Sequence, residues 1–263
     1  MKTLIKALSA KFGVGIFNLR GRYAQDGLFT VHSDDFRSDP AFRAAYGRGV
    51  QASLGVDPGF EWRVHVACWA AQTALRVKGD FVECGVNAGF LSSAIMNKLQ
   101  WNMLGRRFYL IDTFGGPVLT QYSPEEVRKQ RLSIARKALE AGAYVTDLDR
   151  IRANFAEWPS ATVVQGVVPE ILETVDFGAV AFLHIDMNCA LPEQRALEFF
   201  WDRMPPGAVV LLDDYAYYGH DCQRDAIAAV VRDRRAEILS LPTGQGIIVR
   251  QVWIRKRSAY RSA

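Results

Sequence analysis

The sequence is poor in cysteine and has no long apolar run. Its four cysteines are far apart and form no CxxC pair, so neither a zinc site nor a disulfide framework is predicted. A reducing, cytoplasmic setting is therefore expected. No stretch reaches the ~20 apolar residues of a membrane-spanning helix, and we expect no membrane span.

Neither sign of charge is in large excess. The 263 residues include 32 Lys and Arg against 28 Asp and Glu, which gives a formal net charge of +4. This balance predicts no nucleic-acid partner. The basic residues are densest in the tail "RQVWIRKRSAYRSA", which is interpreted as a solvated terminus. The sequence does not decide the oligomeric state, and both a monomer and a homo-oligomer are compatible with it.

The hydrophobic content of 49% is enough for one substantial core. Asp, Gly and Pro are frequent near the start, as in "HSDDFRSDPAFRAAYGRG", and we interpret residues 1–60 as an N-terminal helical extension. The next stretch, "FEWRVHVACWAAQTALRV", predicts an amphipathic helix. Its apolar positions at helical spacing, which we expect in the core, are Trp62, Val66, Trp69, Ala70 and Thr73.

Strand-like and helical patterns alternate along the rest of the chain. The strand-like runs lie at 80–84, 107–112, 161–166, 179–186 and 208–214, and the helical patterns at roughly 89–104, 124–140, 169–175 and 192–203. Apolar strands that alternate with helices indicate an α/β fold with a parallel sheet covered on both faces. Two further runs, 237–242 and 246–254, are separated by "TGQG" and predict a closing antiparallel hairpin.

Acidic residues close four of the five predicted strands. Ligands of such sheets bind at the carboxyl ends of the strands, near the point where the strand order reverses. The residues at these ends are Glu83, Cys84, Gly85, Asp112, Thr113, Gln165, Gly166, His184, Asp186, Asp213 and Asp214. The concentration of acids predicts a binding site at this edge of the sheet.

The turn "VECGVNAG" follows the first of these strands. Gly85 and Gly89 allow a sharp turn and a close approach of the backbone to a ligand. The full G-x-G-x-x-G fingerprint is absent, because Asn87 stands where the second glycine would admit a pyrophosphate. NAD and FAD are therefore disfavoured. Glu83, just before the turn, suits a cationic or hydroxylated ligand better than a phosphate.

Asp112 admits two interpretations. At the end of the second strand its carboxylate can accept hydrogen bonds from both hydroxyls of a ribose, or it can cap the following segment. With Glu83 nearby and no P-loop lysine in the sequence, the first interpretation favours an adenosyl ligand without phosphates. S-adenosyl-L-methionine, whose sulfonium is positive, fits that description.

The second group of acids predicts a divalent cation. His184 and Asp186 are two residues apart on one strand and so point to the same face, and Asp213 and Asp214 end the neighbouring strand. Three converging carboxylates repel one another unless a cation or protons compensate them. Oxygen ligands of this kind suit Mg²⁺ or Ca²⁺. Alternatively, Asp213 or Asp214 merely caps the next segment.

Four motifs in this order resemble those of class I S-adenosylmethionine-dependent methyltransferases: "GDFVECGVNAG", "FYLIDTFGG", "HIDMN" and "PPGAVVLLDDYAYYG". More narrowly, they are similar to the macrocin O-methyltransferase family, which methylates sugar hydroxyls of natural products. The resemblance implies a Rossmann-like three-layer sandwich with a seven-stranded, mostly parallel sheet and an antiparallel last strand. It implies that residues 61–263 methylate a hydroxyl of a small molecule or sugar moiety, in a natural product or a glycan.

The resemblance also implies roles for individual residues. Mg²⁺ would be held by Asp186, Asp213 and Asp214 and would orient the acceptor. Asp186 is the first candidate for the base that an acceptor hydroxyl needs, ahead of His184 and His220. S-adenosylmethionine would be held by Glu83, Gly85, Val86, Asn87, Gly89, Asp112, Thr113, Gln165, Gly166 and Asp186.

One motif departs from the family's usual pattern. "DMNCALPEQ" has Asn188 where the family has a second acid, and it lacks the tyrosine that usually follows. Two alternatives stay open: a degenerate methyltransferase fold that acts as a binding partner or scaffold, and an NAD-linked sugar-modifying enzyme. For the latter, a complete glycine fingerprint and a Tyr-x-x-x-Lys pair are missing. The aromatic residues of "YAYYGHD" are expected either to wall the acceptor pocket or to pack as a loop.

Overall fold

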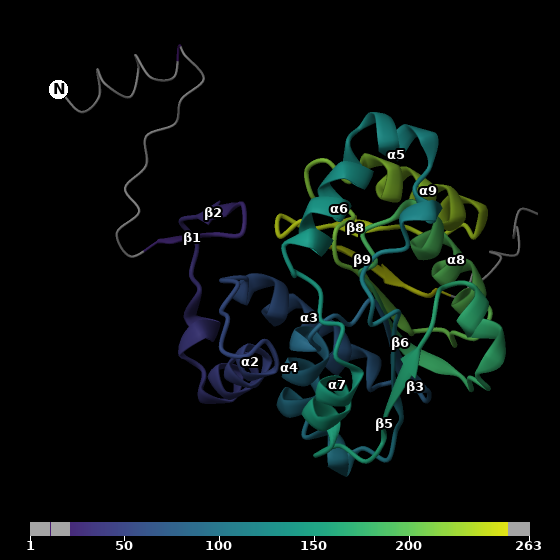
Figure 1. Cartoon of the computed structure of the whole chain (residues 1–263). Coiled ribbons are helices and arrows are strands. Elements are labelled where there is room, and N and C mark those ends of the chain that lie inside the picture. Colours follow the sequence, from purple (N-terminus) through teal and green to yellow (C-terminus); the bar gives the residue numbers. More distant parts are fainter. Residues whose placement is uncertain (1–10, 12–21, 252–263) are drawn as a thin grey trace, which may run out of the picture.

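A seven-stranded sheet forms the centre of this computed structural model, which describes Lys11 and residues 22–251 (Figure 1). Its strands are β3 (Asp80–Cys84), β4 (Phe108–Asp112), β5 (Ala161–Gln165), β6 (Val180–Ile185), β7 (Val209–Leu212), β8 (Leu239–Ser240) and β9 (Gly246–Val249). They lie in the order β5-β4-β3-β6-β7-β9-β8. The first five pair in parallel, and β9 pairs antiparallel with both β7 and β8. The predicted fold class is confirmed.

Helices cover both faces of the sheet and complete the three layers (Figure 1). On one face lie α3 (Glu61–Ala74), α4 (Phe90–Lys98) and α7 (Leu148–Phe155), with α2 (Pro40–Ala52) packed against α4. On the other face lie α8 (Ala190–Trp201) and α9 (Asp221–Asp233). Two short helices, α5 (Pro124–Arg128) and α6 (Arg131–Glu140), follow β4. No helix in the described part is long and apolar enough to cross a membrane.

The alternation of side chains along β3 divides the core in two. Phe81 packs with the residues of α3 and α4, whereas Val82 and Cys84 pack with those of α8 and α9. Because both faces are covered, the strand is apolar almost throughout. Glu83 is the exception: it lies on the α3 side and is 2% exposed, so it needs a buried partner.

The helix predicted before β3 is α3, and of its predicted core stripe Ala70 is buried and Val66 packs against the core, whereas Trp69 lies at the surface. Trp69 is 56% exposed. The residues that α3 buries are Glu61, Val64, Ala67, Cys68, Ala70, Ala71 and Ala74. Mostly small side chains let the helix axis approach the sheet closely, and the large tryptophans do not fit in that narrow layer.

Several predicted helices differ from the structure in extent. The pattern at 124–140 is split into α5 and α6 at Gln130, whose φ is +62°. The pattern at 169–175 is a 3-10 helix, Glu170–Thr174. The helices α7 and α9 were not predicted. The closing hairpin is present, with β9 ending at Val249, and the part of that prediction from residue 252 onward lies outside the described residues, as does most of the basic tail.

The N-terminal extension contains a hairpin as well as a helix. Strands β1 (Tyr23–Gln25) and β2 (Leu28–Thr30) pair antiparallel around Asp26 and Gly27, both with positive φ, as a two-residue hairpin turn requires. A 3-10 helix, Asp35–Ser38, and α2 follow. The hairpin lies beside the carboxyl edge of the sheet, where Asp26 contacts α3 through Arg63.

Candidate active site

Two pockets meet at the carboxyl edge of the sheet. The larger has a volume of about 660 Å³ and the smaller about 120 Å³. Four residues line both of them: Gly85, Asn87, Asp186 and Asn188. These residues belong to the turns after β3 and β6, the two strands between which the strand order reverses. The junction therefore lies where a ligand site is expected in this kind of sheet.

The turn after β3 is shaped by its contacts within the protein. Gly85 has φ +94°, and a Cβ there would overlap the backbone oxygen of Asp186. Gly89 has φ +79°, and a Cβ there would lie 2.5 Å from the ring of Phe155. The close approach that these glycines permit is thus to the neighbouring turn and to α7. Gly85 still lines both pockets, whereas Gly89 lines neither.

Asp112 ties the ends of β3 and β4 together. Its Oδ2 accepts hydrogen bonds from the backbone N–H groups of Val86 (2.7 Å) and Asn87 (2.9 Å). Its Oδ1 accepts from the N–H of Phe114 (2.8 Å) and lies 3.3 Å from the hydroxyl of Thr113, which donates to Gly116 O (2.6 Å). A carboxylate offers about four lone-pair sites, so these three N–H bonds occupy most of them. In this arrangement Asp112 shapes the wall of the smaller pocket, and ribose recognition stays a prediction.

Asn87 explains why the middle glycine of the fingerprint is replaced. Its φ of +47° is one that Asn tolerates better than most residues. Its Nδ2 donates to Ala143 O (3.2 Å) and its Oδ1 accepts from Val145 N–H (2.9 Å). The side chain thereby fixes the segment between α6 and α7, which lines the larger pocket through Gly142, Ala143 and Val145.

Buried polar side chains connect β3, β6 and β7 on the α3 side of the sheet. His184 Nδ1 lies 2.9 Å from Glu83 Oε1, and His184 Nε2 lies 3.8 Å from Asp213 Oδ1. Burial by itself would lower the pKa of His184, but these two carboxylates raise it to about 10. His184 is therefore enclosed between two carboxylates. It is 1% exposed and lines neither pocket, so it is not placed to receive a proton from an acceptor.

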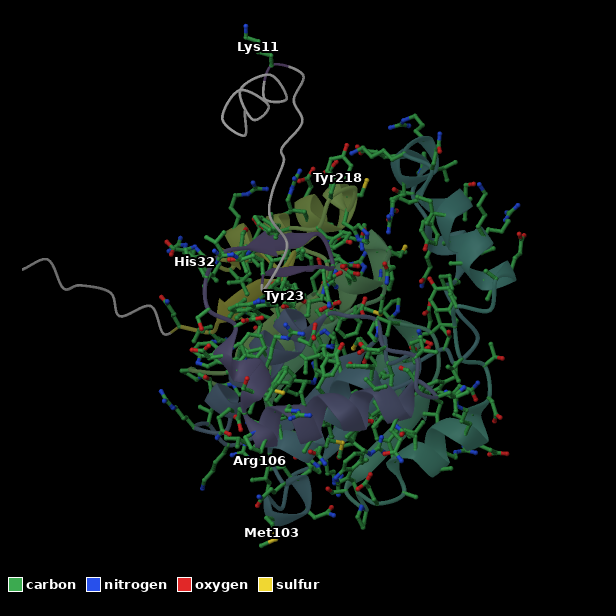
Figure 2. All side chains as sticks on the ribbon, turned by 90° about the vertical axis from the view of Figure 1, so that its left-hand side faces the viewer. Lys11, Tyr23, His32, Met103, Arg106 and Tyr218 are labelled. Carbon is green, nitrogen blue, oxygen red and sulfur yellow. The ribbon has the colours of Figure 1, made fainter. Side chains whose placement is uncertain are left out.

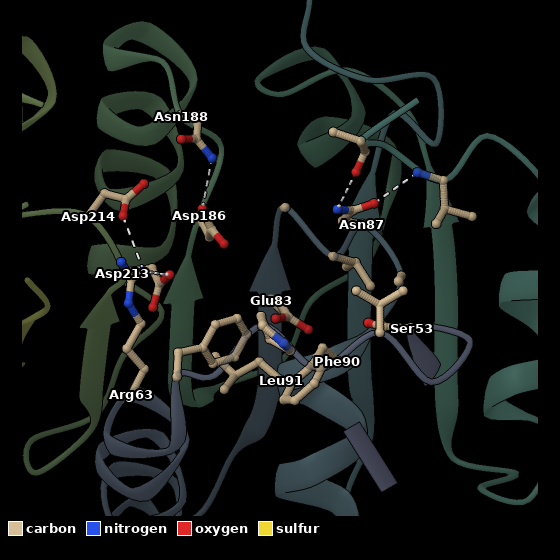
Figure 3. Close-up of a pocket in the computed structure, with 18 of the residues that line it drawn as sticks. Ser53, Arg63, Glu83, Asn87, Phe90, Leu91, Asp186, Asn188, Asp213 and Asp214 are labelled. Atoms are coloured by element: carbon tan, nitrogen blue, oxygen red, sulfur yellow. Dashed lines mark hydrogen bonds and ion pairs between the residues drawn. The ribbon is translucent and has the colours of Figure 1, made fainter. Parts of the chain in front are cut away.

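Arg63, at the start of α3, holds the acids that end β7 (Figure 3). Its Nη1 donates to Asp213 Oδ2 (2.5 Å) and to Asp214 Oδ1 (3.3 Å), and its Nε donates to Asp26 Oδ2 (2.7 Å). Burial by itself would raise the pKa of Asp213, but Arg63 and His184 lower it below its usual range. Burial and the neighbouring Asp213 raise the pKa of Asp214 to about 6.

Asp186 is the acid that both pockets share. Its Oδ1 accepts a hydrogen bond from Asn188 Nδ2 (3.1 Å). Burial, together with the charges of Asp213 and Asp214, raises the pKa of Asp186 well above its usual range. Glu193, in the first turn of α8, supports this segment by accepting a hydrogen bond from Met187 N–H (3.1 Å). Asn188, in place of the family's second acid, thus supplies a donor to Asp186.

His220 is also away from both pockets. It precedes α9, is 7% exposed, and its Nδ1 lies 3.3 Å from Asp214 Oδ2. Burial, and then the charges of Arg131 and Arg63, lower the pKa of His220 to about 4. Its neutral ring packs against the ring of Tyr217. Of the three predicted base candidates, only Asp186 reaches a pocket.

The aromatic residues of "YAYYGHD" do not wall a pocket. Tyr217 stacks on the guanidinium of Arg63, with its ring centroid 4.9 Å from Cζ. Tyr215 lies against Gly246 of β9, and Tyr218 is 98% exposed (Figure 2). Neither pocket is lined by any of the three, so the packed-loop alternative describes Tyr215 and Tyr217.

The comparison with protein families decides the identity. Residues 82–215, slightly more than half of the chain, match the model of a family described as a methyltransferase domain. The chain belongs to this methyltransferase family. The matched range runs from β3 to just beyond Asp214, so it contains the turns after all five parallel strands.

Individual relatives agree with the family assignment. A protein of Streptomyces olivaceus, 8-demethyl-8-(2,3-dimethoxy-alpha-L-rhamnosyl)-tetracenomycin-C 4'-O-methyltransferase, is 30% identical over 159 residues. The match covers 57% of this chain and 57% of that protein, so the chain spans little more than half the length of this curated relative.

Solved structures confirm the methyltransferase fold. The O-methyltransferase NovP superposes with a TM-score of 0.64 at 16% identity, over 84% of this chain and 100% of that one. The calicheamicin methyltransferase CalS11 superposes with a TM-score of 0.57 at 15% identity, over 90% and 98%. At these identities the likeness concerns the fold, and the predicted resemblance to class I methyltransferases holds.

In this methyltransferase the predicted site residues divide between the two pockets. The smaller is lined by Gly85, Asn87, Asp112, Thr113, Gly166 and Asp186. The larger is lined by Glu83, Gly85, Val86, Asn87, Asp186, Asp213 and Asp214. Gln165, also predicted to hold S-adenosylmethionine, lines neither pocket, and its Nε2 donates to Thr113 O (3.2 Å). The predicted set therefore lines two adjacent pockets, except for Gly89, Gln165, His184 and His220.

Other lining residues of the methyltransferase could not be recognised in the sequence. The extension contributes Asp26, Ser53, Leu54, Val56, Pro58 and Phe60 to the larger pocket, and α3 and α7 contribute Arg63 and Arg150. The smaller pocket is completed by Gly116, Pro117, Val118, Gln121, Tyr144, Val167 and Val168, among others. The "FGG" of the second motif was the one signal that pointed toward Gly116.

The predicted metal ligands do not fit a divalent cation in this arrangement. Asp213 and Asp214 already share a cation, the guanidinium of Arg63. Among the described residues, no three His, Cys, Asp or Glu side chains are grouped in a way that could hold a metal ion. The acids do gather at one edge of the sheet, but their compensating charge comes from α3.

Proposed function

We propose that this methyltransferase transfers a methyl group from S-adenosylmethionine to a hydroxyl of a small molecule or of a sugar moiety. The adenosyl part of the donor would occupy the smaller pocket, and the acceptor would occupy the larger one. The observation that supports this most directly is the junction of the two pockets at Gly85, Asn87, Asp186 and Asn188. Two substrates that react with each other must meet at such a junction.

Glu83 supports the placement of the donor's amino acid end. Its Oε2 is buried and has no hydrogen-bond partner among the described residues, while Oε1 bonds to His184. A buried carboxylate oxygen without a partner is costly. Glu83 lines the larger pocket beside Gly85 and Val86, so an ammonium group in that corner would satisfy the oxygen.

Asp186 supports a transfer to oxygen. Bound S-adenosylmethionine supplies a methyl group on a positively charged sulfur, which needs little further activation. As the new C–O bond forms and the S–C bond breaks, the hydroxyl proton must leave, and Asp186 Oδ2 is the acceptor that faces the junction without a protein partner among the described residues. Asn188 would fix the other oxygen.

The charges of the larger pocket favour an uncharged or cationic acceptor. Its lining contains five acidic side chains and two basic ones, Arg63 and Arg150. An anionic group entering this space would be repelled. A neutral glycoside is compatible with it, and the Streptomyces olivaceus relative is named for methylation of a rhamnosyl-bearing tetracenomycin.

Calorimetry with S-adenosylmethionine and S-adenosylhomocysteine tests the donor site. We expect both to bind the whole chain with a Kd of about 1–100 μM, within the usual range for enzyme substrates. Val118→Trp, which fills the smaller pocket, should weaken this binding at least about tenfold. The matched control is Val127→Trp on α5, where the native side chain is 46% exposed and lines neither pocket. Absence of binding of either ligand to the native chain would remove the proposal.

A screen for S-adenosylhomocysteine release with neutral glycosides, amino sugars and phenols tests the acceptor. With an acceptor found in this way, Asp186→Asn should lower kcat at least about 100-fold while leaving S-adenosylhomocysteine binding close to native. Asp149→Asn, at a side chain that is 92% exposed on α7, is the matched control. An Asp186→Asn variant with native kcat would exclude Asp186 as the base.

A further inference from the structure

We propose that the guanidinium of Arg63 takes the place of a divalent cation in this site, so that the chain binds no Mg²⁺ there and needs none for methyl transfer. The inference deepens the proposed function and, for the transfer step, rests on it. It starts from the three carboxylates that the guanidinium bonds, Asp26, Asp213 and Asp214.

Most of the carboxylate oxygens are already in use. Gln245 Nε2 bonds Asp213 Oδ1 (2.9 Å), and Arg63 bonds Asp213 Oδ2. Arg63 bonds Asp214 Oδ1, and His220 Nδ1 lies 3.3 Å from Asp214 Oδ2. Asn188 bonds Asp186 Oδ1. Of the six oxygens of the predicted ligands, two receive no hydrogen bond from the described residues: Asp186 Oδ2, and Asp214 Oδ2 beside the neutral ring of His220.

A divalent cation would have to break this network before it could bind. Mg²⁺ requires near-octahedral oxygen ligation at about 2.1 Å, which two free oxygens on separate carboxylates do not supply. The cation would also approach Arg63, whose side chain is 11% exposed, and the repulsion between the two positive charges is weakly screened there. The site thus contains its own permanent cation, since an arginine does not lose its proton in proteins.

Two contacts besides those with Asp213 and Asp214 fix the position of the Arg63 guanidinium. Tyr217 covers one face of the guanidinium, at 4.9 Å from Cζ. Tyr217 in turn is held against Gly244, where a Cβ would lie 2.7 Å from Cδ2 of the ring. Asp26, from the β1–β2 hairpin, fixes Nε. The guanidinium is therefore largely buried and held by several contacts, unlike an isolated ion pair at the surface.

The guanidinium also retains a donor for the acceptor. Nε and Nη1 are engaged by the three carboxylates, whereas Nη2 has no acceptor among the described residues, and Arg63 lines the larger pocket. A metal would orient an acceptor by coordinating its oxygens. Arg63 would orient it by donating N–H groups from Nη2, which selects hydroxyl or ether oxygens at that position.

Binding of Mn²⁺, followed by electron paramagnetic resonance, tests the inference without any acceptor. We expect the native chain to bind no Mn²⁺ with a Kd below about 1 mM, weaker than most protein sites for hard cations. Arg63→Ala removes the guanidinium from Asp26, Asp213 and Asp214, and it should bind one Mn²⁺ at least about tenfold more tightly than the native chain. The double variant Arg63→Ala/Asp213→Asn should lose that gain.

Arg150→Ala is the matched control, because Arg150 lines the same pocket but bonds Ala52 O (3.1 Å) and none of the acids. It should gain no Mn²⁺ affinity. Circular dichroism establishes whether each variant is folded. If Arg63→Ala is unfolded, Arg63→Lys replaces it. This variant keeps a positive charge at the site, so it should stay folded and bind no Mn²⁺. The inference would be overturned if the native chain bound one Mn²⁺ tightly and if Asp213→Asn abolished that binding. Calorimetry with S-adenosylhomocysteine fails only if the proposed function fails, so the two failures are distinguishable.

Discussion

The two pockets of this methyltransferase are constructed in different ways. The walls of the smaller one come from the turns after consecutive strands, and Asp112 joins them through backbone hydrogen bonds to residues 86, 87 and 114. The polar end of the larger one is held by ion pairs between segments as much as 150 residues apart, such as Arg63 and Asp213. The smaller pocket therefore depends on the conformation of short motifs, whereas the larger pocket depends on how the extension and α3 pack on the sheet.

The largest expected effect is at the junction itself. Gly85→Ala places a Cβ onto the backbone oxygen of Asp186 and should destabilise the fold by more than about 4 kcal/mol, with loss of both pockets. Gly105→Ala is the matched control: its φ of +61° is also positive, but nothing lies within 4 Å of the new Cβ, so about 1 kcal/mol is expected. Urea unfolding measures both. Equal costs would mean that the contact between the turns after β3 and β6 is unimportant.

The second effect concerns Glu193, which supports the segment around Asp186 and Asn188 that lines both pockets. Burial raises the pKa of Glu193 from 4.5 to about 8. Because its folded pKa lies above its unfolded one, the wild type should be most stable below pH 4.5 with respect to this group and should lose stability as the pH rises through about 8.

Glu193→Gln keeps an oxygen for Met187 N–H but has no charge to bury. We expect the variant to gain about 3 kcal/mol over the wild type between pH 5 and pH 9, as measured by urea unfolding at several pH values. Glu198→Gln, on the same helix at a side chain that is 32% exposed, is the control and should change the stability by less than about 1 kcal/mol. A flat difference for Glu193→Gln would mean that the carboxyl ionises in the fold without cost.

The third effect is confined to the larger pocket. Asp26→Asn removes the charged bond to Arg63 Nε, and it should cost about 2 kcal/mol and leave S-adenosylhomocysteine affinity unchanged. Asp34→Asn breaks a comparable bond, to Arg37, at a side chain that is 34% exposed, and about 0.5 kcal/mol is expected. Thermal melts and calorimetry measure the two quantities. A loss of S-adenosylhomocysteine affinity in Asp26→Asn would show that the two pockets do not depend on separate contacts.

The smallest effect is at the turn after β3. Asn87→Gly keeps the positive φ but removes two hydrogen bonds to the segment between α6 and α7, at a cost of about 1 kcal/mol. The amide of Val145, which bonds Asn87 Oδ1, should exchange its hydrogen faster, while the amide of Gly166, which bonds Asp112 O, should keep its rate. Unchanged exchange at Val145 would contradict the role given to Asn87.

Much of the sheet and its binding edge could be predicted from the sequence. Four of the five parallel strands, β3, β4, β6 and β7, are buried almost throughout, so their apolar runs are almost uninterrupted, and the acids at their ends stand out. The edge strand β5 is only partly buried. Asp112, Asp186 and Asp213 could be singled out for this reason. The family motifs then identified the turn at Gly85.

The helices could be predicted less well, because packing and not periodicity decides which residues they bury. In α3 the alanines face the sheet and Trp69 faces outward, the reverse of what side-chain size suggests. The same reasoning explains His184: its position on β6 was evident, but only its pairing with Glu83 shows that it is enclosed.

The sequence by itself determined the α/β architecture, the methyltransferase motifs and the edge at which the acids gather, because these follow from local patterns of apolar, glycine and acidic residues. Tertiary structure alone decided what compensates those acids. The guanidinium of Arg63 reaches Asp213 across 150 residues of chain, and no local pattern marks an arginine in an ordinary helix as the partner of a distant strand end. Ion pairs between remote segments are formed by folding, and they decide here whether three carboxylates bind a metal ion or a side chain.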